Sequence, residues 1–417
     1  MSLFDKVIQY RYKYIPDHVI GEILTKPWID NFIPFLILSM GIFFFGMTIP
    51  DFFSVGSIVD ATRQLGEFGL VVLAMVIVMI AGGIDLSVSS IFALSNLTAQ
   101  GLITLGGWPI IAVIPAVLLV GGITGLINGL LIGYLRLRAF LTTLVTLVIV
   151  RSVVDFLLLR YSIKIAAISP SSAVWDFIGN GTVLNIPFSF FVLLIITAVL
   201  HVVFSRMRPG WHIMAIGGAR RSAYNAGIPV KRYICLTYVT SGVLVSIAGL
   251  LYAARLFSQG FETGVGLEIM AFTAAVVGGN SLGGGKGSAA KAFMGAIIIL
   301  LLVNGLIRLG LKSGATSMFL GLMLLFAVTI DVRWVKNRYK ILSKVYVSPT
   351  YFSLPPAPST DSESLSPYAL NDRLRNVESI GLGMIDGPED VILDDNDNLY
   401  CGNRTGDIVV FKAPDYK

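Results

Sequence analysis

The sequence predicts an all-α polytopic membrane protein of about ten transmembrane helices, with cytoplasmic N- and C-termini and a small β-rich C-terminal fragment. The composition supports this fold class, because 55% of the 417 residues are hydrophobic and only 13% are charged, whereas soluble domains carry roughly 25% charged residues. The apolar residues also gather in runs close to the ~20 residues that a helix needs to cross a bilayer. These observations exclude a soluble globular protein.

About ten apolar runs follow one another between residues 31 and 331, and each is a candidate span. In chain order they cover 31–50, 68–82, 86–106, 109–134, 140–159, 188–205, 234–256, 267–280, 288–310 and 314–331. The residues before them mix charges with aromatic side chains and show none of the parts of a cleaved signal peptide. We therefore predict a cytoplasmic or interfacial segment over 1–30 and a transmembrane domain over 31–333.

Basic residues orient these spans, because Lys and Arg in short loops face the cytoplasm. The segment 206–233 is rich in Arg and Lys and has no acidic residue, whereas between 257 and 268 the only charged residues are Glu262 and Glu268. Ten spans with a cytoplasmic N-terminus place both segments on the expected sides. Topology thus accounts for the net charge of +6, so the expected surroundings are membrane lipid, and no nucleic-acid partner is implied.

The stretch 278–288, GGNSLGGGKGS, looks at first like a phosphate-binding loop. A Walker A loop requires Ser or Thr directly after its lysine, but here Lys286 is followed by Gly287. We therefore predict a tight cytoplasmic turn in which glycines supply positive φ and close approach. Gly278 and Gly279 also end an unusually short span, and irregular backbone in a membrane is tolerated where it lines a cavity.

Acidic residues beside apolar runs are candidates for function by default. Asp85 lies in the segment AGGIDLSVSS (81–90), between two candidate spans. It can line a pathway or, with Ser87, cap the following helix by accepting backbone N–H groups, and the two interpretations are compatible. Asp155 lies four residues after Arg151, a helical spacing that predicts a structural ion pair.

The side chains that usually bind metals are few and dispersed. Cys235 and Cys401 have neither metal-ligand nor disulfide-framework spacing, and the three histidines are scattered. We therefore expect no metal site in the membrane domain.

Four segments resemble a known family. They are GGIDLSVSSIFAL (82–94), GLINGLLIGYLRLRAFLTTLVTLVIVRS (125–152), AVVGGNSLGGGKGS (275–288) and GAIIILLLVNGLIRLG (295–310). Together they resemble the membrane permeases of ribose- and xylose-type ABC sugar importers, in the branched-chain amino-acid/ribose permease superfamily. The resemblance implies a permease subunit, not an enzyme, that moves a monosaccharide or sugar derivative across the bacterial inner membrane by alternating access.

The resemblance also implies partners and a coupling loop. The partners are a separate cytoplasmic ABC ATPase, a periplasmic solute-binding protein, and a second permease copy in a homodimer. ATP and Mg bind to the ATPase, so this chain is expected to bind no cofactor. The coupling loop is the basic segment 217–230, in which a short helix from Ser222 to Ala226, stopped by Gly227, would form a knob for a groove on the ATPase; an ordinary basic loop is the alternative. The residues assigned to this loop are Gly217, Gly218, Arg220, Arg221, Ala223, Ala226, Gly227 and Ile228, and those assigned to the substrate pathway are Asp85, Ser87, Asn96, Asn128, Gly278 and Gly279.

Beyond about residue 345 the composition changes to that of a Pro/Ser-rich linker. We predict a basic and then Pro/Ser-rich linker over 334–380 and a partial β-propeller blade over 381–417. The blade is predicted because 387–411 alternate as short strands around Asp, Asn and Gly turns and resemble the opening of gluconolactonase/strictosidine-synthase-like propellers. That resemblance implies a metal role for Glu389 only in a complete propeller, which typically has 4–8 blades, so the fragment is expected to be catalytically inert.

Two alternatives remain open. An ion-coupled secondary transporter also uses broken helices and intramembrane acids, and it would need no ATPase. A membrane-anchored, lactonase-like fusion enzyme would need a complete propeller.

Overall fold

The computed structural model describes residues 29–166, 172–312, 314–329, 359–364, 367–372, 375–388, 390–404 and 406–416. The interfacial segment predicted before residue 29, the linker residues up to 358 and Glu389 lie outside the described residues. The chain forms two compact units, Met1–Tyr346 and Val347–Lys417. The domain boundaries given above stay a prediction.

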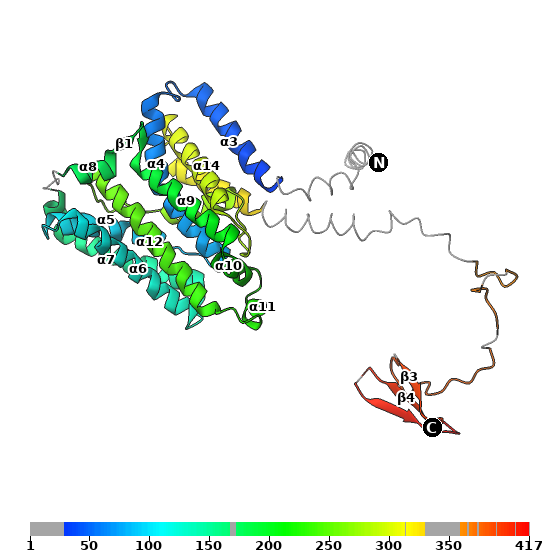
Figure 1. Ribbon diagram of the computed structural model, residues 1–417. Coiled ribbons are helices and arrows are strands. Elements are labelled where there is room, and N and C mark those ends of the chain that lie inside the picture. The colour runs from blue at the N-terminus through cyan, green and yellow to red at the C-terminus, as the bar shows by residue number, and fades with distance from the viewer. Residues whose placement is uncertain are drawn as a thin grey trace. The chain divides into compact units, whose positions relative to one another are not determined.

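The first unit is a bundle of apolar helices (Figure 1). The helices in the predicted runs are α3 (Ile29–Thr48), α4 (Val55–Ile80), α5 (Val88–Thr104), α6 (Ile110–Gly133), α7 (Ala139–Ala166), α9 (Phe188–Arg206), α12 (Val230–Leu256), α13 (Leu267–Val277), α14 (Ala289–Arg308) and Gly314–Thr329. Within the described residues, six are long and apolar enough to cross a membrane, namely α4, α6, α7, α9, α12 and α14. The mostly helical fold is thus confirmed, whereas the full set of about ten spans stays a prediction.

Helices α4 and α12 form the centre of the bundle. Every residue of α4 from Leu65 to Ile80 is buried, and α12 packs along α4, α5 and α6. Glycines allow close contacts between α6 and α12: a Cβ added at Gly125 of α6 would lie 2.3 Å from the carbonyl oxygen of Tyr238 on α12. The helices around the α4–α5 break are therefore held tightly together.

The two ends of the bundle are built differently. At one end lie α10 (Arg208–Gly218) and α11 (Arg220–Asn225), and at the other lie α8 (Ala173–Asn180) and the hairpin of β1 (Thr182–Val183) and β2 (Ile186–Pro187) (Figure 1). The short helix expected in the basic loop is present as α11, although it begins at Arg220 and not at Ser222. Neither α8, α10 nor the hairpin is predicted by a pattern in the sequence. Helix α10 is short, and its second residue is Pro209, which fits only the first turn of a helix.

The second unit contains a three-stranded antiparallel sheet in the order β3 (Val391–Leu393), β4 (Leu399–Gly402) and β5 (Ile408–Phe411). This confirms the short strands predicted around Asp and Asn turns. The carboxylate of Asp394 organises the β3–β4 turn by accepting hydrogen bonds from the backbone N–H groups of Asn396 (2.9 Å) and Asn398 (2.8 Å). A hydrogen bond from the Asn398 side chain, together with these two backbone bonds, holds the pKa of Asp394 below its usual value.

Candidate functional site

A buried carboxyl group lies in the break between α4 and α5. Asp85 is 0% exposed. Its Oδ1 accepts hydrogen bonds from the backbone N–H (3.1 Å) and the hydroxyl (2.5 Å) of Ser87, and its Oδ2 accepts one from the hydroxyl of Ser241 on α12 (2.8 Å). The carboxyl group therefore bonds to Ser87, the residue before the first turn of α5, whose own side chain makes no capping bond to that turn, and it also links the break to the central helix.

The same network continues to two further helices. The side-chain amide of Asn128 on α6 donates to the Ser87 hydroxyl (2.9 Å) and accepts from the hydroxyl of Thr146 on α7 (2.6 Å). The structure thus brings together three of the predicted pathway residues, Asp85, Ser87 and Asn128, and fixes the break against α6, α7 and α12. All three are fully buried, and their role in a pathway stays a prediction.

Asn96 belongs to a separate cluster. It lies nine residues after Ser87, about 13 Å along a helix axis, and its side chain donates to the Ser258 carbonyl (3.3 Å) and to the Gln259 side chain. Arg151 reaches the same loop by donating to the Thr263 carbonyl (2.6 Å). These contacts attach α5 and α7 to the segment between α12 and α13.

The predicted partners Arg151 and Asp155 lie close to each other on α7. The Arg151 Nε is 3.3 Å from the Asp155 Oδ1, as expected for an i,i+4 pair. Because Arg151 also contacts the loop before α13, the pair stabilises a helix and a loop at once.

Glycines from three distant segments meet at the end of the bundle that carries α10. We call this contact the glycine junction and define it as Gly82, Gly217, Gly284 and Gly285. The backbone N–H of Gly285 donates to the Ile80 carbonyl (2.9 Å). A Cβ added at Gly217 would lie 1.9 Å from that carbonyl oxygen, and one added at Gly284 would lie 2.8 Å from the Gly82 Cα.

The glycine stretch at 278–288 therefore has a physical role in the structure. It forms a turn in which Gly284 and Gly285 have φ of +77° and +73°, a region that favours glycine. The backbone of this turn packs against the end of α4 and the end of α10. Gly278 and Gly279 lie elsewhere: Gly278 follows the last residue of α13, where an added Cβ would lie 2.1 Å from the Lys291 carbonyl oxygen of α14.

The segment predicted as the coupling loop combines a buried and an exposed side. Ala223 is buried and, with Ile216, packs in one cluster with Val78 of α4 and Tyr238 of α12. On the exposed side are Arg220, Arg221, Ala226 and Gly227, and Ile228 is half-buried. The loop is thus attached to the bundle through both apolar side chains and the glycine junction, and its other side is accessible to a partner.

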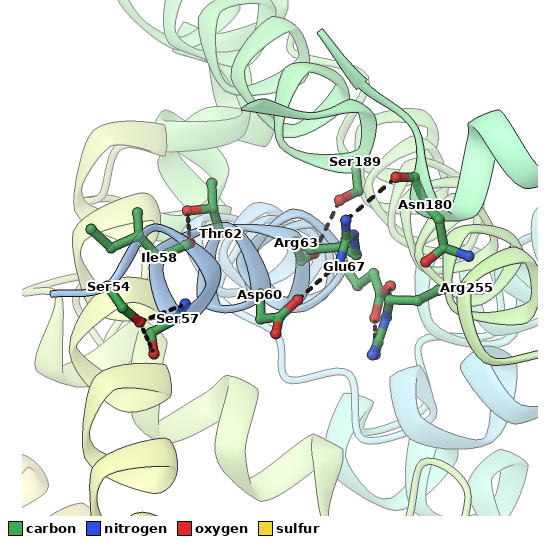
Figure 2. A network of polar contacts seen from close by, with 10 residues as sticks. All are labelled: Ser54, Ser57, Ile58, Asp60, Thr62, Arg63, Glu67, Asn180, Ser189 and Arg255. Atoms are coloured by element: carbon green, nitrogen blue, oxygen red, sulfur yellow. Dashed lines mark hydrogen bonds and ion pairs between the residues drawn. The ribbon is translucent and has the colours of Figure 1, made fainter. Parts of the chain in front are cut away.

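A charged network at the opposite end, shown in Figure 2, is not predicted from the sequence. Glu67 is only 5% exposed, and its carboxylate accepts from the Nε (2.6 Å) and Nη2 (2.9 Å) of Arg255. Next to this pair Arg63 donates to Asp60 (2.9 Å) and to the Asn180 carbonyl (3.4 Å). The predicted span began at residue 68, just after Glu67, whereas the buried part of α4 begins at Leu65.

The first unit is therefore a multi-pass membrane protein with a polar network in the break between two of its helices. Residues 57–328 match the family described as branched-chain amino acid transport system / permease component, and the chain belongs to this family. It is a bacterial ABC-importer permease, a transport subunit and not an enzyme. Permeases of this kind work with an ATPase and a solute-binding protein.

Curated relatives are similar over most of their length. The ribose import permease protein of Haemophilus influenzae is 35% identical over 71% of this chain and 91% of its own. The D-allose transport system permease protein of Escherichia coli is 32% identical over 72% and 91%, and the fructose import permease protein of Bifidobacterium longum is 31% identical over 69% and 78%. The resemblance stated from the sequence is confirmed.

The second unit has its own match. Residues 366–411 match the family described as strictosidine synthase-like, N-terminal, which confirms the predicted propeller-type fragment. No solved structure matched the chain.

Proposed function

We propose that this chain is the transmembrane subunit of an ATP-driven importer that moves a monosaccharide or sugar derivative inward across the bacterial inner membrane by alternating access. The names of the relatives support the substrate class, since they transport ribose, allose and fructose. In this proposal about ten helices span the membrane with both ends cytoplasmic, and α10 and α11 face the ATPase.

The glycine junction is the observation that carries the proposal. In an importer, ATP binding must move the coupling loop, and that movement must reach the helices around the substrate. Here the end of α10 contacts the end of α4 backbone to backbone, without intervening side chains that could absorb a displacement. Packed contacts of this kind transmit movement because protein interiors are dense and poorly compressible. Asp85 lies five residues beyond Ile80, so a displaced coupling loop acts directly on the α4–α5 break.

The remaining assignments follow from this proposal. ATP and Mg bind to the partner ATPase, and this chain holds no cofactor. A periplasmic solute-binding protein docks on the outer face, and a second copy of the permease completes a homodimer. The outward apolar side chains of α6 and α7, among them Leu119, Leu144 and Val148, are exposed in the single chain and are available to lipid or to that second copy.

The test compares two neighbouring glycines of the coupling loop. A Cβ at Gly217 would clash with backbone, whereas one at Gly218 would meet only the Gly285 Cα at 3.9 Å, an ordinary contact. The tagged chain is solubilised from its native membranes and the purified complex is assayed for ATP hydrolysis. We expect ATPase activity to co-purify with the wild type and with Gly218→Ala, and to fall at least about tenfold with Gly217→Ala.

Two results would contradict the proposal. Equal activity of the two variants would show that the junction does not couple the subunits. If no ATPase co-purifies under conditions that keep the complex intact, the ion-coupled secondary transporter takes first place.

The second unit is proposed to be inert. Its described residues contribute three short strands, and β3 is exposed along its whole length, which buries too little for independent stability. Purified residues 346–417 are therefore expected to show no cooperative thermal transition. A sharp transition together with lactone hydrolysis would instead support the fusion-enzyme alternative.

A further inference from the structure

The bundle contains a partly open cavity of about 220 Å³ at the end opposite the glycine junction. Its lining comes from α4, α5, α12, α13, α14 and the loop between α12 and α13. The residues that matter for its chemistry are Gln64, Glu67, Phe92, Tyr252, Arg255 and Val265. Pockets for drug-sized ligands are larger, about 300–1,000 Å³, so this cavity is suited to one small molecule.

The charges that line the cavity cancel each other. Glu67 and Arg255 form two parallel hydrogen bonds of 2.6 and 2.9 Å, a geometry that fixes both groups. A paired carboxylate and guanidinium present no net charge that would select an anion or a cation. Their remaining acceptor and donor positions can still bind a neutral molecule that carries several hydroxyl groups.

The other side chains complete such a surface. Gln64 accepts a hydrogen bond from Asn304 (3.0 Å), which orients an amide whose nitrogen is a donor. The rings of Phe92 and Tyr252 meet edge to face with centroids 5.1 Å apart, and Arg255 lies over the Tyr252 ring at 5.3 Å. The cavity thus offers aromatic surface for the C–H faces of a sugar ring and polar groups for its hydroxyls.

Burial of this pair within a membrane bundle needs an explanation. Two desolvated charges contribute little net stability compared with apolar residues of similar volume, and ionisable groups within membrane proteins mark functional sites by default. We propose that the cavity binds one neutral monosaccharide, as a site within the permease subunit near its outer end. This inference rests on the proposed function for its substrate class and its orientation.

The experiment measures sugar binding directly and does not depend on the ATPase. The thermal unfolding midpoint of the purified full-length chain is measured in nanodiscs with increasing ribose, allose or fructose, and with glycerol as the control solute. A ligand that binds only the folded state raises this midpoint with concentration. We expect at least one of the three sugars to raise it, and glycerol at the same concentration to leave it unchanged.

Three variants locate the site. Val265 is 60% exposed at the rim of the cavity, so Val265→Trp fills the opening and Val265→Ala leaves it open. The shift is expected to vanish with Val265→Trp and to persist with Val265→Ala. Tyr252→Phe removes one hydroxyl and is expected to weaken the apparent affinity roughly two- to tenfold, the equivalent of one hydrogen bond.

Every other outcome overturns the inference. No shift with any of the three sugars means that the cavity is not a monosaccharide site, and a shift that survives Val265→Trp means that the sugar binds elsewhere. Loss of the shift in both Val265 variants means that the rim acts through the fold and not by occupying the opening. The proposed importer function fails separately, if no ATPase co-purifies with the chain.

Discussion

The two ends of the helical bundle hold their helices together by opposite means. At the end with α10 and α11, backbone meets backbone through glycines, and the backbone N–H of Gly285 donates to the Ile80 carbonyl. At the end with α8, long charged side chains link the helices, and the central pair is Glu67 of α4 with Arg255 of α12 (Figure 2). A backbone contact has few alternative arrangements, whereas charged side chains can exchange partners with a ligand. The first construction suits the transmission of movement, and the second suits recognition.

The largest effect is expected from breaking the charged end. Glu67→Ala leaves the Arg255 guanidinium partly buried without its counter-charge, and removal of one partner from a buried pair costs about 3–5 kcal/mol. The free energy of unfolding of the full-length chain in detergent micelles measures this change. The double variant Glu67→Ala, Arg255→Ala should cost less than the sum of the two single variants, because it leaves no uncompensated charge. A cost below about 1 kcal/mol for Glu67→Ala would mean that the pair contributes no more than an ordinary surface ion pair. The two ends of the bundle would then not differ in the way described above.

A smaller effect is expected at the glycine junction. Gly284→Ala places a side chain at φ +77° and 2.8 Å from the Gly82 Cα, and the combined strain is expected to cost about 2–3 kcal/mol. The neighbouring Gly283 is the matched control, since an added Cβ there meets only the Ser281 hydroxyl at 3.7 Å. Gly283→Ala should therefore change the free energy of unfolding by less than about 0.5 kcal/mol. Equal costs at both positions would mean that the turn is not seated on α4 in solution.

The comparison also shows what the sequence could predict. The apolar runs predicted the positions of the helices, because a run of hydrophobic residues is a local pattern that a single sequence shows. Each glycine pair of the junction was also visible, at 82–83, 217–218 and 284–285. Their meeting was not, because it depends on how α4, α10 and the turn before α14 pack together, and no local pattern encodes that distance.

The candidate residues divide in the same way. The i,i+4 spacing indicated the contact of Arg151 with Asp155, because both lie on one helix. Ser241 and Arg255 were not singled out, since each bonds to a residue more than a hundred positions away. A helical projection of α4 that began at Leu65 would have placed Glu67 among buried residues and flagged it as an acid in need of a partner.

The smallest effect is expected within the α4–α5 break, which lies between the two constructions. Ser241→Ala removes the one hydrogen bond, of 2.8 Å, that the structure gives the Asp85 Oδ2, while Oδ1 keeps both bonds from Ser87. We expect a loss of about 1.5 kcal/mol, at the lower end of the range for hydrogen bonds to charged groups. Ser246→Ala on the same helix is the control, because its hydroxyl donates to the nearby Val243 carbonyl of its own helix, and it should cost less than half as much. If the two serines cost the same, Asp85 does not anchor the break to α12, and a movement that enters at the glycine junction would end at α4 without reaching the central helix.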